Sequence, residues 1–446
     1  MSTTADSRWP PPRVVTAAAI MVAIDVAAVF SMAANVAWGW HLLGLLLVFA
    51  ILGWWVRRDL GRVGIGAVLA ITVAVQLTGL LTFPLTSDDI YRYVWDGRVQ
   101  LAGIDPYRHV PLDPALNSLR DPFLFPPGAR PMINRPAVPT IYPPGAQAWF
   151  TLVGAVTAAG WALAALRIGA AAAVVGTTAV IACWLGRDRR SALLFGANPL
   201  IMIEAANGGH LDSLVALAVS GFAWCAARRR HWLAGLFLGL AASIKLVPLL
   251  LVPVLLRHGR WRTSLTGVGL TVAGYVPHVL VVGALVLGYL PGYWSEEGYG
   301  AGGRFALLAW LPADVRTAVA LTIAALLAGI AFWRSGRDPV LVTCTWLYGA
   351  SFVVATPIYP WYAMPLLVLA VMARRWEWLA VWMAVYVAFV FDHALAVQGV
   401  AYGLAMIIVV AAGLRRRANG SRSTSVTGDG RHRLVSAPAG VRDQTG

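Results

Sequence analysis

Long apolar runs, separated by short polar segments, repeat along most of this chain of 446 residues. Runs such as residues 14–36, 265–290 and 395–414 are long enough to cross a bilayer, because a helix of about 20 apolar residues spans the hydrocarbon core. We therefore predict an all-α polytopic membrane protein, with about 12–14 transmembrane helices counted from the apolar runs.

Clusters of arginine between the apolar runs predict the topology. If the runs are alternating spans, the loops that hold Arg57, Arg228 and Arg415 all fall on one side of the membrane. Loops rich in arginine are cytoplasmic as a rule. We therefore expect residues 1–13 to form a cytoplasmic N-terminus, and the long polar segment at residues 86–144 to be the first outer loop.

The remaining organisation follows from the same pattern. Residues 14–414 are expected to form one membrane domain, followed by a basic cytoplasmic tail at 415–446. The tail is polar and rich in glycine and serine, a composition that buries too little apolar surface to fold, so we predict that it is disordered. Residues 192–206 and 211–227 are predicted to cross outward and back, whereas the amphipathic segment 146–160 is expected to lie along the outer interface.

The composition narrows the functional classes. Hydrophobic residues make up 59% of the chain and charged residues only 12%, which is far from the average of soluble proteins. The net charge of +15 could indicate nucleic acid or anionic lipid, but the arginines lie between the spans, so we assign the charge to membrane topology and expect no nucleic-acid partner. The three cysteines lie inside predicted spans without metal-ligand spacing, and we expect them to be inert.

Two charged residues lie inside apolar runs. Lys245 is the only lysine in the chain, and it separates the short runs 232–243 and 246–256, which we expect to form a broken pair of helices. It is there either by chance, with its ammonium reaching toward the interface, or for its compact charge; we favour the second. Asp25 interrupts the first span, where we expect a structural partner for it.

Two adjacent carboxylates, Asp88 and Asp89, open the predicted outer loop at the mouth of a span. Carboxylates near a bilayer are costly and tend to mark function. If residues 89–101 are helical, Asp89, Arg92 and Asp96 share one face of the helix. Asp96 then either pairs with Arg92 or is free, and Asp88 is either the N-cap or a functional group. Asp89 is the residue that structure alone explains least.

A second group of polar residues lies near residues 204–212. Glu204 interrupts an apolar run and needs a partner. His210 is either an interfacial histidine or a functional one, and we favour function; Asp212 either caps the following helix or belongs to the site. The remaining candidates on the expected outer side are Arg98, Tyr142, Lys245, Tyr359, Trp361 and Tyr362.

Four motifs occur in order along the chain. They are the segment from Asp89 to Tyr107, the motif Thr140-Ile141-Tyr142-Pro143-Pro144, the residues Asn198-Pro199, Glu204 and His210-Leu211-Asp212, and the motif Ile358-Tyr359-Pro360-Trp361-Tyr362. Together they resemble the GT-C glycosyltransferases, and more closely the bacterial polyprenyl-phosphate-mannose-dependent mannosyltransferases of cell-envelope lipoglycans. The resemblance runs from about residue 64 to residue 414. It departs at the third motif, where His-Leu-Asp stands instead of the expected His-Asn-Asp.

This resemblance implies a GT-C type bundle and an inverting sugar transfer at the outer face of the bacterial plasma membrane. The implied donor is a polyprenyl-phosphate sugar, with mannose favoured, and the implied acceptor is a cell-envelope glycolipid or glycan. Asp89 matches the family's catalytic aspartate and is the candidate base, with Asp88 beside it. Lys245, Arg92 or Arg98 could hold the donor phosphate.

A metal ion is an open alternative. Carboxylate oxygens suit Mg²⁺ or Mn²⁺, so such an ion could lie between carboxylates such as Asp88 and Glu204. A single displacement needs only one carboxylate as base, and it has no requirement for a metal in itself.

The competing class of protein is a transporter or flippase of a lipid-linked sugar, which also uses intramembrane charges and broken helices. Transporters place their sites near the midplane between repeats, whereas the polar residues here gather on one side and no repeat is visible. A scaffold protein without activity would not need the pair of carboxylates. The sequence therefore favours an enzyme.

Overall fold

The structure is a computed structural model that describes residues 11–34, 38–58, 60–158, 160–257 and 259–429. Every regular element in these ranges is helical, as the sequence predicts. Most of the predicted cytoplasmic N-terminus, residues 1–13, lies outside the described residues.

The first three helices follow the predicted runs. They are α1 (Pro12–Ala34), α2 (Gly39–Arg58) and α3 (Ile65–Gly79). α3 ends at Gly79, before the predicted end at residue 85, because side chains from other elements take over its last carbonyl groups: the Gly79 carbonyl accepts hydrogen bonds from Arg167 at 2.6 Å and Asn207 at 3.1 Å. Asp25 of α1 is buried without the expected hydrogen-bond partner among the described residues.

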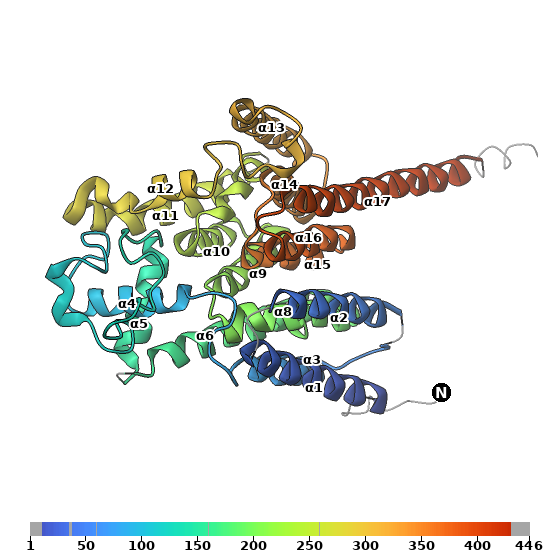
Figure 1. Ribbon diagram of the computed structural model, residues 1–446. Coiled ribbons are helices and arrows are strands. Elements are labelled where there is room, and N and C mark those ends of the chain that lie inside the picture. The colour runs from blue at the N-terminus through green and yellow to red at the C-terminus, as the bar shows by residue number, and fades with distance from the viewer. Residues whose placement is uncertain (1–10, 35–37, 59, 159, 258, 430–446) are drawn as a thin grey trace, which may run out of the picture.

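The predicted outer loop carries its own helices. They are α4 (Asp89–Leu101), the 3₁₀ helix η1 (Pro114–Leu119) and, after the loop, α5 (Pro144–Val156). The predicted helix over residues 89–101 is confirmed. α5 packs along α4 at one end of the molecule (Figure 1), and the contact is close because Gly97 leaves room for the backbone of Phe150. The predicted amphipathic segment 146–160 is thus mostly helical and lies beside α4.

The centre of the chain corrects one prediction. Residues 192–206 do not form a single span: the short helices α7 (Leu193–Gly196) and α8 (Pro199–Met202) are separated at Asn198, whose side chain accepts from the amide of Leu200. A π-helical turn, η3 (Ile203–Asn207), follows, and α9 (Asp212–Ala227) leaves it at an angle of 116°. A proline cannot continue the preceding helix, and the nine residues from Pro199 to Asn207 rise only about 14 Å.

The neighbouring elements surround this broken segment. They are α6 (Ala162–Leu185), η2 (Gly186–Ala192), α10 (His231–Ile244), η4 (Val247–Leu255), α11 (Trp261–Val282), η5 (Gly283–Leu287), α12 (Leu290–Glu296) and η6 (Ala306–Leu308). α10 and η4 separate at Lys245, whose backbone is extended, so the predicted broken pair is confirmed.

The C-terminal part adds α13 (Ala313–Arg334), α14 (Val340–Ala355), η7 (Pro360–Ala363), α15 (Met364–Met372), η8 (Trp376–Trp378), α16 (Leu379–Val390) and α17 (Leu395–Asp429). α17 continues to Asp429, into the tail predicted at 415–446, and the disorder of that tail stays a prediction. Arginine and alanine at 415–418 are good helix formers, and Arg416 pairs with Glu377 at 2.6 Å. Residues 430–446 lie outside the described residues.

Six helices in the described ranges are long and apolar enough to cross a membrane, or seven if the bent pair counts as one span. Five shorter apolar helices accompany them, so the predicted number of about 12–14 is approached only if the short helices also count as crossings. α4, α5 and α12 lie at one end of the bundle, while α1 begins and α17 extends at the opposite end (Figure 1). The chain is a multi-pass membrane protein with its loop helices gathered at one end.

Candidate active site

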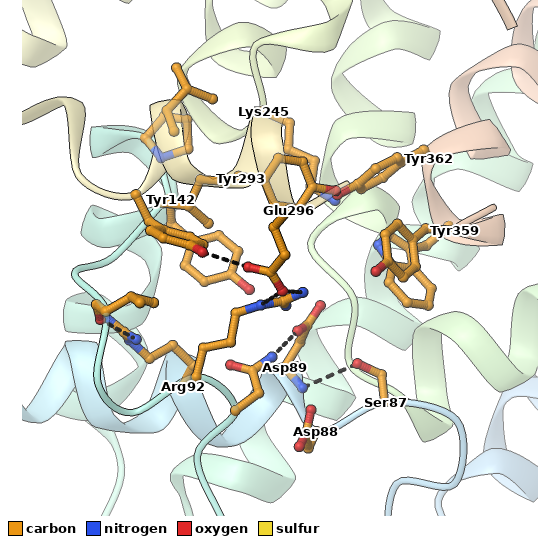
Figure 2. Close-up of a pocket in the computed structure, with 18 of the residues that line it drawn as sticks. Ser87, Asp88, Asp89, Arg92, Tyr142, Lys245, Tyr293, Glu296, Tyr359 and Tyr362 are labelled. Atoms are coloured by element: carbon orange, nitrogen blue, oxygen red, sulfur yellow. Dashed lines mark hydrogen bonds and ion pairs between the residues drawn. The ribbon is translucent and has the colours of Figure 1, made fainter. Parts of the chain in front are cut away.

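A cavity of about 600 Å³ opens at the end of the bundle that carries α4 and the loop at residues 86–144. Its wall combines the start of α4 with the junction of α10 and η4, with α12 and with the segment before α15 (Figure 2). The polar and aromatic side chains that line it are Ser87, Asp88, Asp89, Arg92, Arg130, Asn134, Arg135, Tyr142, Lys245, Tyr289, Tyr293, Glu296, Tyr359, Trp361 and Tyr362.

The two carboxylates at the start of α4 differ in their surroundings. Asp88 occupies the N-cap position, but its side chain does not cap the helix; the hydroxyl of Ser87 accepts from the amide of Asp89 at 3.1 Å instead. The helix-cap interpretation of Asp88 is therefore wrong as far as its side chain is concerned. Asp88 is exposed, whereas Asp89 reaches deeper into the wall and accepts a hydrogen bond from Asn134 (Figure 2).

The carboxyl of Asp89 is suited to proton exchange near neutral pH. Burial, together with the neighbouring charge of Asp88, raises the pKa of Asp89 to about 6, although Lys245, Asn134 and Arg135 oppose that rise. Burial also raises the pKa of Asp88, with Arg130 among the groups that oppose it. A carboxyl group in this range can accept a proton without being protonated most of the time.

Arg92 forms the predicted pair with Asp96. Its Nε atom donates to Asp96 at 2.8 Å, and its second donor group reaches the carbonyl of Val138 at 3.2 Å. Asp96 in turn accepts from Thr140 at 2.6 Å and from Gln147 at 3.0 Å. Arg92 lines the cavity, and its bonds to Asp96 and Val138 hold the loop at residues 86–144 against α4.

The structure does not bring Arg98 to the cavity. Its guanidinium pairs with Asp121 at 2.5 Å and donates to the carbonyl of Leu119 at 3.0 Å, on a different face of α4. Both partners of the pair are about one-third exposed. Arg98 holds the distal part of the outer loop.

Lys245 reaches the cavity from the break between α10 and η4. Its ammonium lies 2.5 Å from a carboxylate oxygen of Asp212 and 4.0 Å from the ring centre of Tyr362. Asp212 begins α9 without capping it, so the alternative in which it serves as a helix cap is wrong. An ammonium that is held by one carboxylate and one aromatic face still has donor capacity toward the cavity.

Glu204, His210 and Asp212 do not line the cavity; they lie behind its wall, and the side chains of Glu204 and His210 have no exposed surface. The ring of His210 stacks on Trp361 with ring centres 3.9 Å apart. One ring nitrogen lies 3.9 Å from Asp89 and the other lies 3.4 Å from Glu204. His210 thus stands between the two carboxyl groups.

Aromatic side chains complete the wall. The hydroxyl of Tyr359 donates to Glu297 at 2.9 Å, and the hydroxyls of Tyr293 and Tyr362 lie 2.9 Å apart. Tyr142 packs edge-on against Phe150 with ring centres 5.6 Å apart. Such a wall offers flat apolar faces and hydroxyl groups together, which suits a sugar ring.

The sequence did not single out several of the lining residues, among them Arg130, Asn134, Arg135 and Tyr293. Asn134 bonds to Asp89, and Arg135 pairs with Glu296 at 2.5 Å across the mouth of the cavity. Arg130 and Tyr293 also line the wall. Their common signal in the sequence is only that they are polar residues in the predicted outer loop at residues 86–144 or in the segment at residues 291–312, which the same topology places on the outer side. That signal does not distinguish them from their neighbours.

The predicted cation between Asp88 and Glu204 stays a prediction. No group of three or more histidine, cysteine or acidic side chains in the described part of the chain is arranged to hold a metal ion. The carboxyl of Glu204 faces His210 behind the wall, whereas Asp88 faces outward. The two carboxyl groups therefore do not form one donor set in this arrangement.

Comparison with known proteins identifies the family. The family model for the N-terminal domain of alpha-(1->6)-mannopyranosyltransferases matches residues 9–258, which is more than half of the chain. No curated protein and no solved structure matches the chain. The matched region contains Asp89, His210 and Lys245, and it agrees with the resemblance of the motifs to bacterial mannosyltransferases. The chain belongs to the alpha-(1->6)-mannopyranosyltransferase family and is a multi-pass membrane mannosyltransferase.

Proposed function

We propose that this mannosyltransferase takes mannose from a polyprenyl-phosphate donor and transfers it to a cell-envelope glycolipid or glycan. The transfer takes place at the outer face of the bacterial plasma membrane, with Asp89 as the base of an inverting single displacement. The observation that carries the proposal is Asp89 itself, which lies in the wall of a 600 Å³ cavity near the ammonium of Lys245 and a group of aromatic rings.

The bond changes match this arrangement. A hydroxyl oxygen of the acceptor attacks the anomeric carbon, and the bond from that carbon to the phosphate oxygen breaks with its electron pair left on the phosphate. The hydroxyl proton goes to Asp89. The leaving phosphate is a weak base, so it needs charge stabilisation rather than protonation.

Lys245 is the cation that best fits the leaving phosphate. It is the only lysine of the chain, and it lines the cavity at a break in a helical pair where its backbone is extended. Arg92 is held by Asp96, and Arg98 lies outside the cavity. The proposal therefore assigns the phosphate to Lys245 and leaves both arginines a structural role.

The location of the cavity supports a lipid-linked donor. It lies at one end of a bundle whose helices α11 and α13 expose many apolar side chains, so a polyprenyl chain in the bilayer could present its phosphate at the wall. The arginine-rich loops lie at the other ends of the same helices, which supports an outward-facing cavity.

The experiment is a transfer assay on the purified protein in proteoliposomes, with a panel of polyprenyl-phosphate sugars and with product analysis. We expect consumption of polyprenyl-phosphate mannose and a new glycosidic bond of inverted configuration. Asp89→Asn should lower kcat by at least about 1000-fold at an unchanged amount of protein, because the amide cannot accept the proton.

Two results would overturn the proposal. Movement of the lipid-linked sugar across the bilayer without any glycosidic product would identify a flippase instead. Near-normal transfer by Asp89→Asn would refute its role as base and direct attention to Asp88.

A further inference from the structure

Two buried polar side chains behind the cavity have no role in the proposed reaction as described above. Glu204 and His210 are fully buried, and the carboxyl oxygens of the first and the ring nitrogens of the second have no hydrogen-bond partner among the described residues. Buried polar groups in native proteins are nearly always paired. Both side chains lie near the proposed base, so the hydrogen bonds that they form could affect catalysis.

The imidazole of His210 is held in one orientation. Its ring is nearly parallel to Trp361, at an angle of 14°, and stacks on it. Its Nε2 atom lies 3.4 Å from Glu204, and its Nδ1 atom lies 3.9 Å from the Oδ2 atom of Asp89. Both separations exceed hydrogen-bond length by less than about 1 Å, and catalytic hydrogen bonds often tighten only when substrate is bound.

The surroundings of Glu204 favour its neutral form. The nearest ammonium, Lys245, is already paired with Asp212 at 2.5 Å. The hydroxyl of Tyr386, which neighbours Glu204 and donates to the carbonyl of Leu200 at 3.3 Å, is neutral and supplies no positive charge to the carboxyl group. An ionised carboxyl with no exposed surface and no paired cation costs several kcal/mol, so the carboxyl group keeps its proton.

We propose that Glu204 and His210 are positioning residues for Asp89, an inference that rests on the assignment of Asp89 as base. The neutral carboxyl of Glu204 donates a hydrogen bond to Nε2 of His210 and keeps its proton. This hydrogen bond selects the tautomer with hydrogen on Nδ1, which is directed at Oδ2 of Asp89.

The arrangement holds both oxygens of the base. Asn134 donates to Oδ1 of Asp89, and Nδ1 of His210, now 3.9 Å from Oδ2, would donate to that oxygen when the site tightens around substrate. Donors to the ionised form keep Asp89 deprotonated and oriented until the acceptor hydroxyl arrives. No proton moves along Glu204 and His210 during transfer, because the hydroxyl proton ends on Asp89.

A pair of replacements at Glu204 tests the neutral donor. Glu204→Gln keeps a neutral donor for Nε2, and we expect its kcat to stay within about threefold of the wild type. Glu204→Leu has similar volume and no donor, and we expect kcat to fall by at least about tenfold with the donor KM unchanged. Asp25→Leu, which removes another buried carboxyl far along the first helix, is the matched control and should retain wild-type kcat.

Replacement of His210 gives an independent readout. His210→Phe keeps the stacking on Trp361 and removes the donor, while the neighbouring charges of Asp88, Arg135 and Lys245 remain. We expect a lower kcat and an acidic limb of the pH profile that moves upward by about one pH unit, because Asp89 loses a donor to its charged form. This readout still decides the question if Glu204→Leu does not fold.

Several results would overturn the inference. Equal loss of activity in Glu204→Gln and Glu204→Leu would mean that the ionised carboxylate is needed. Wild-type kcat in Glu204→Leu, or an unmoved acidic limb in His210→Phe, would remove the positioning role. A raised donor KM with unchanged kcat would make His210 a binding residue. If Asp89→Asn is inactive while any of these results is obtained, the positioning role fails but the proposed function stands. The failure of this inference can thus be distinguished from the failure of the proposed function.

Discussion

At the scale of single residues, the two adjacent carboxylates have separate surroundings. Asp88 is exposed at the start of α4, and the hydroxyl of Ser87, rather than the carboxylate of Asp88, accepts from the amide of Asp89. Asp89 is half-buried and bonded to Asn134. Their difference arises at the start of the helix, because Asp88 precedes the first helical residue, Asp89.

The pH dependence of transfer should report the carboxyl of Asp89. Burial raises the pKa of Asp89 to about 6, so its protonated and inactive form persists to higher pH than for an exposed aspartate. We expect kcat/KM for the donor to fall tenfold per pH unit below about 6 and to be level from there to about pH 8. A profile that stays level down to pH 4.5 would contradict the assignment.

Replacement of Lys245 by methionine should weaken use of the donor. The change keeps most of the side-chain volume and removes the ammonium that is assigned to the phosphate. A lost charge-assisted hydrogen bond of about 2 kcal/mol corresponds to a loss of about 30-fold in kcat/KM for the donor.

Lys245→Arg is the matched control for this replacement. It restores the charge but not the compact shape, and we expect intermediate activity. Unchanged donor kinetics in Lys245→Met would remove this residue from the phosphate site.

At the scale of elements, the loop at residues 86–144 is held on α4 by a buried network around Asp96. This carboxylate accepts from Arg92, Thr140 and Gln147, and it is almost fully buried. The network connects the first helix of the loop with the segment that precedes α5. The loop thereby keeps Asn134 beside Asp89.

Asp96→Asn should therefore loosen the loop. The replacement leaves the buried guanidinium of Arg92 without a counter-charge, which costs on the order of 3 kcal/mol. We expect a lower Tm in detergent and faster cleavage of the loop at residues 86–144 by protease.

The pair of Arg98 and Asp121 provides the control for Asp96→Asn. It joins the same helix to the same loop, but both partners are about one-third exposed. Asp121→Asn should change the stability by less than about 1 kcal/mol. Equal effects of the two replacements would show that the buried network does not hold the loop.

At the scale of the whole molecule, the loop helices and the cavity lie at one end of the bundle, and the ends of α2 and α17 with their arginines lie at the other (Figure 1). We predict that these two ends lie on opposite sides of the membrane, with the cavity on the outer side. In a variant without the three native cysteines, Ala129→Cys in the outer loop should react with a membrane-impermeant thiol reagent on intact cells, while Arg417→Cys should react only after permeabilisation.

Both engineered cysteines should react after permeabilisation, which controls for their accessibility. The reverse pattern on intact cells would place the cavity in the cytoplasm and would exclude a donor that is presented at the outer face.

Local patterns in the sequence were sufficient to predict much of the fold. The apolar lengths predicted most helices, and the helix over residues 89–101 together with the pair of Arg92 and Asp96 followed from helical spacing alone. The prediction failed between residues 192 and 206, where apolar length hid the break at Asn198 and Pro199. Apolar length measures the cost of exposure to water, and it contains little information about where the backbone bends.

The candidate site also has features that the sequence predicts and features that only the tertiary structure shows. The sequence alone determined that this is a helical membrane protein and that Asp89 and Lys245 are out of place in their surroundings. It also predicts that the arginine loops share one side. Those conclusions depend on the free-energy cost of burying a charged side chain, which is set by the residue type and can therefore be read from the sequence. Only the tertiary structure decided that Asn134 and His210 meet Asp89, that Arg98 faces away, and that Asp212 pairs with Lys245. These are contacts between elements distant along the chain, and their geometry depends on how the helices pack.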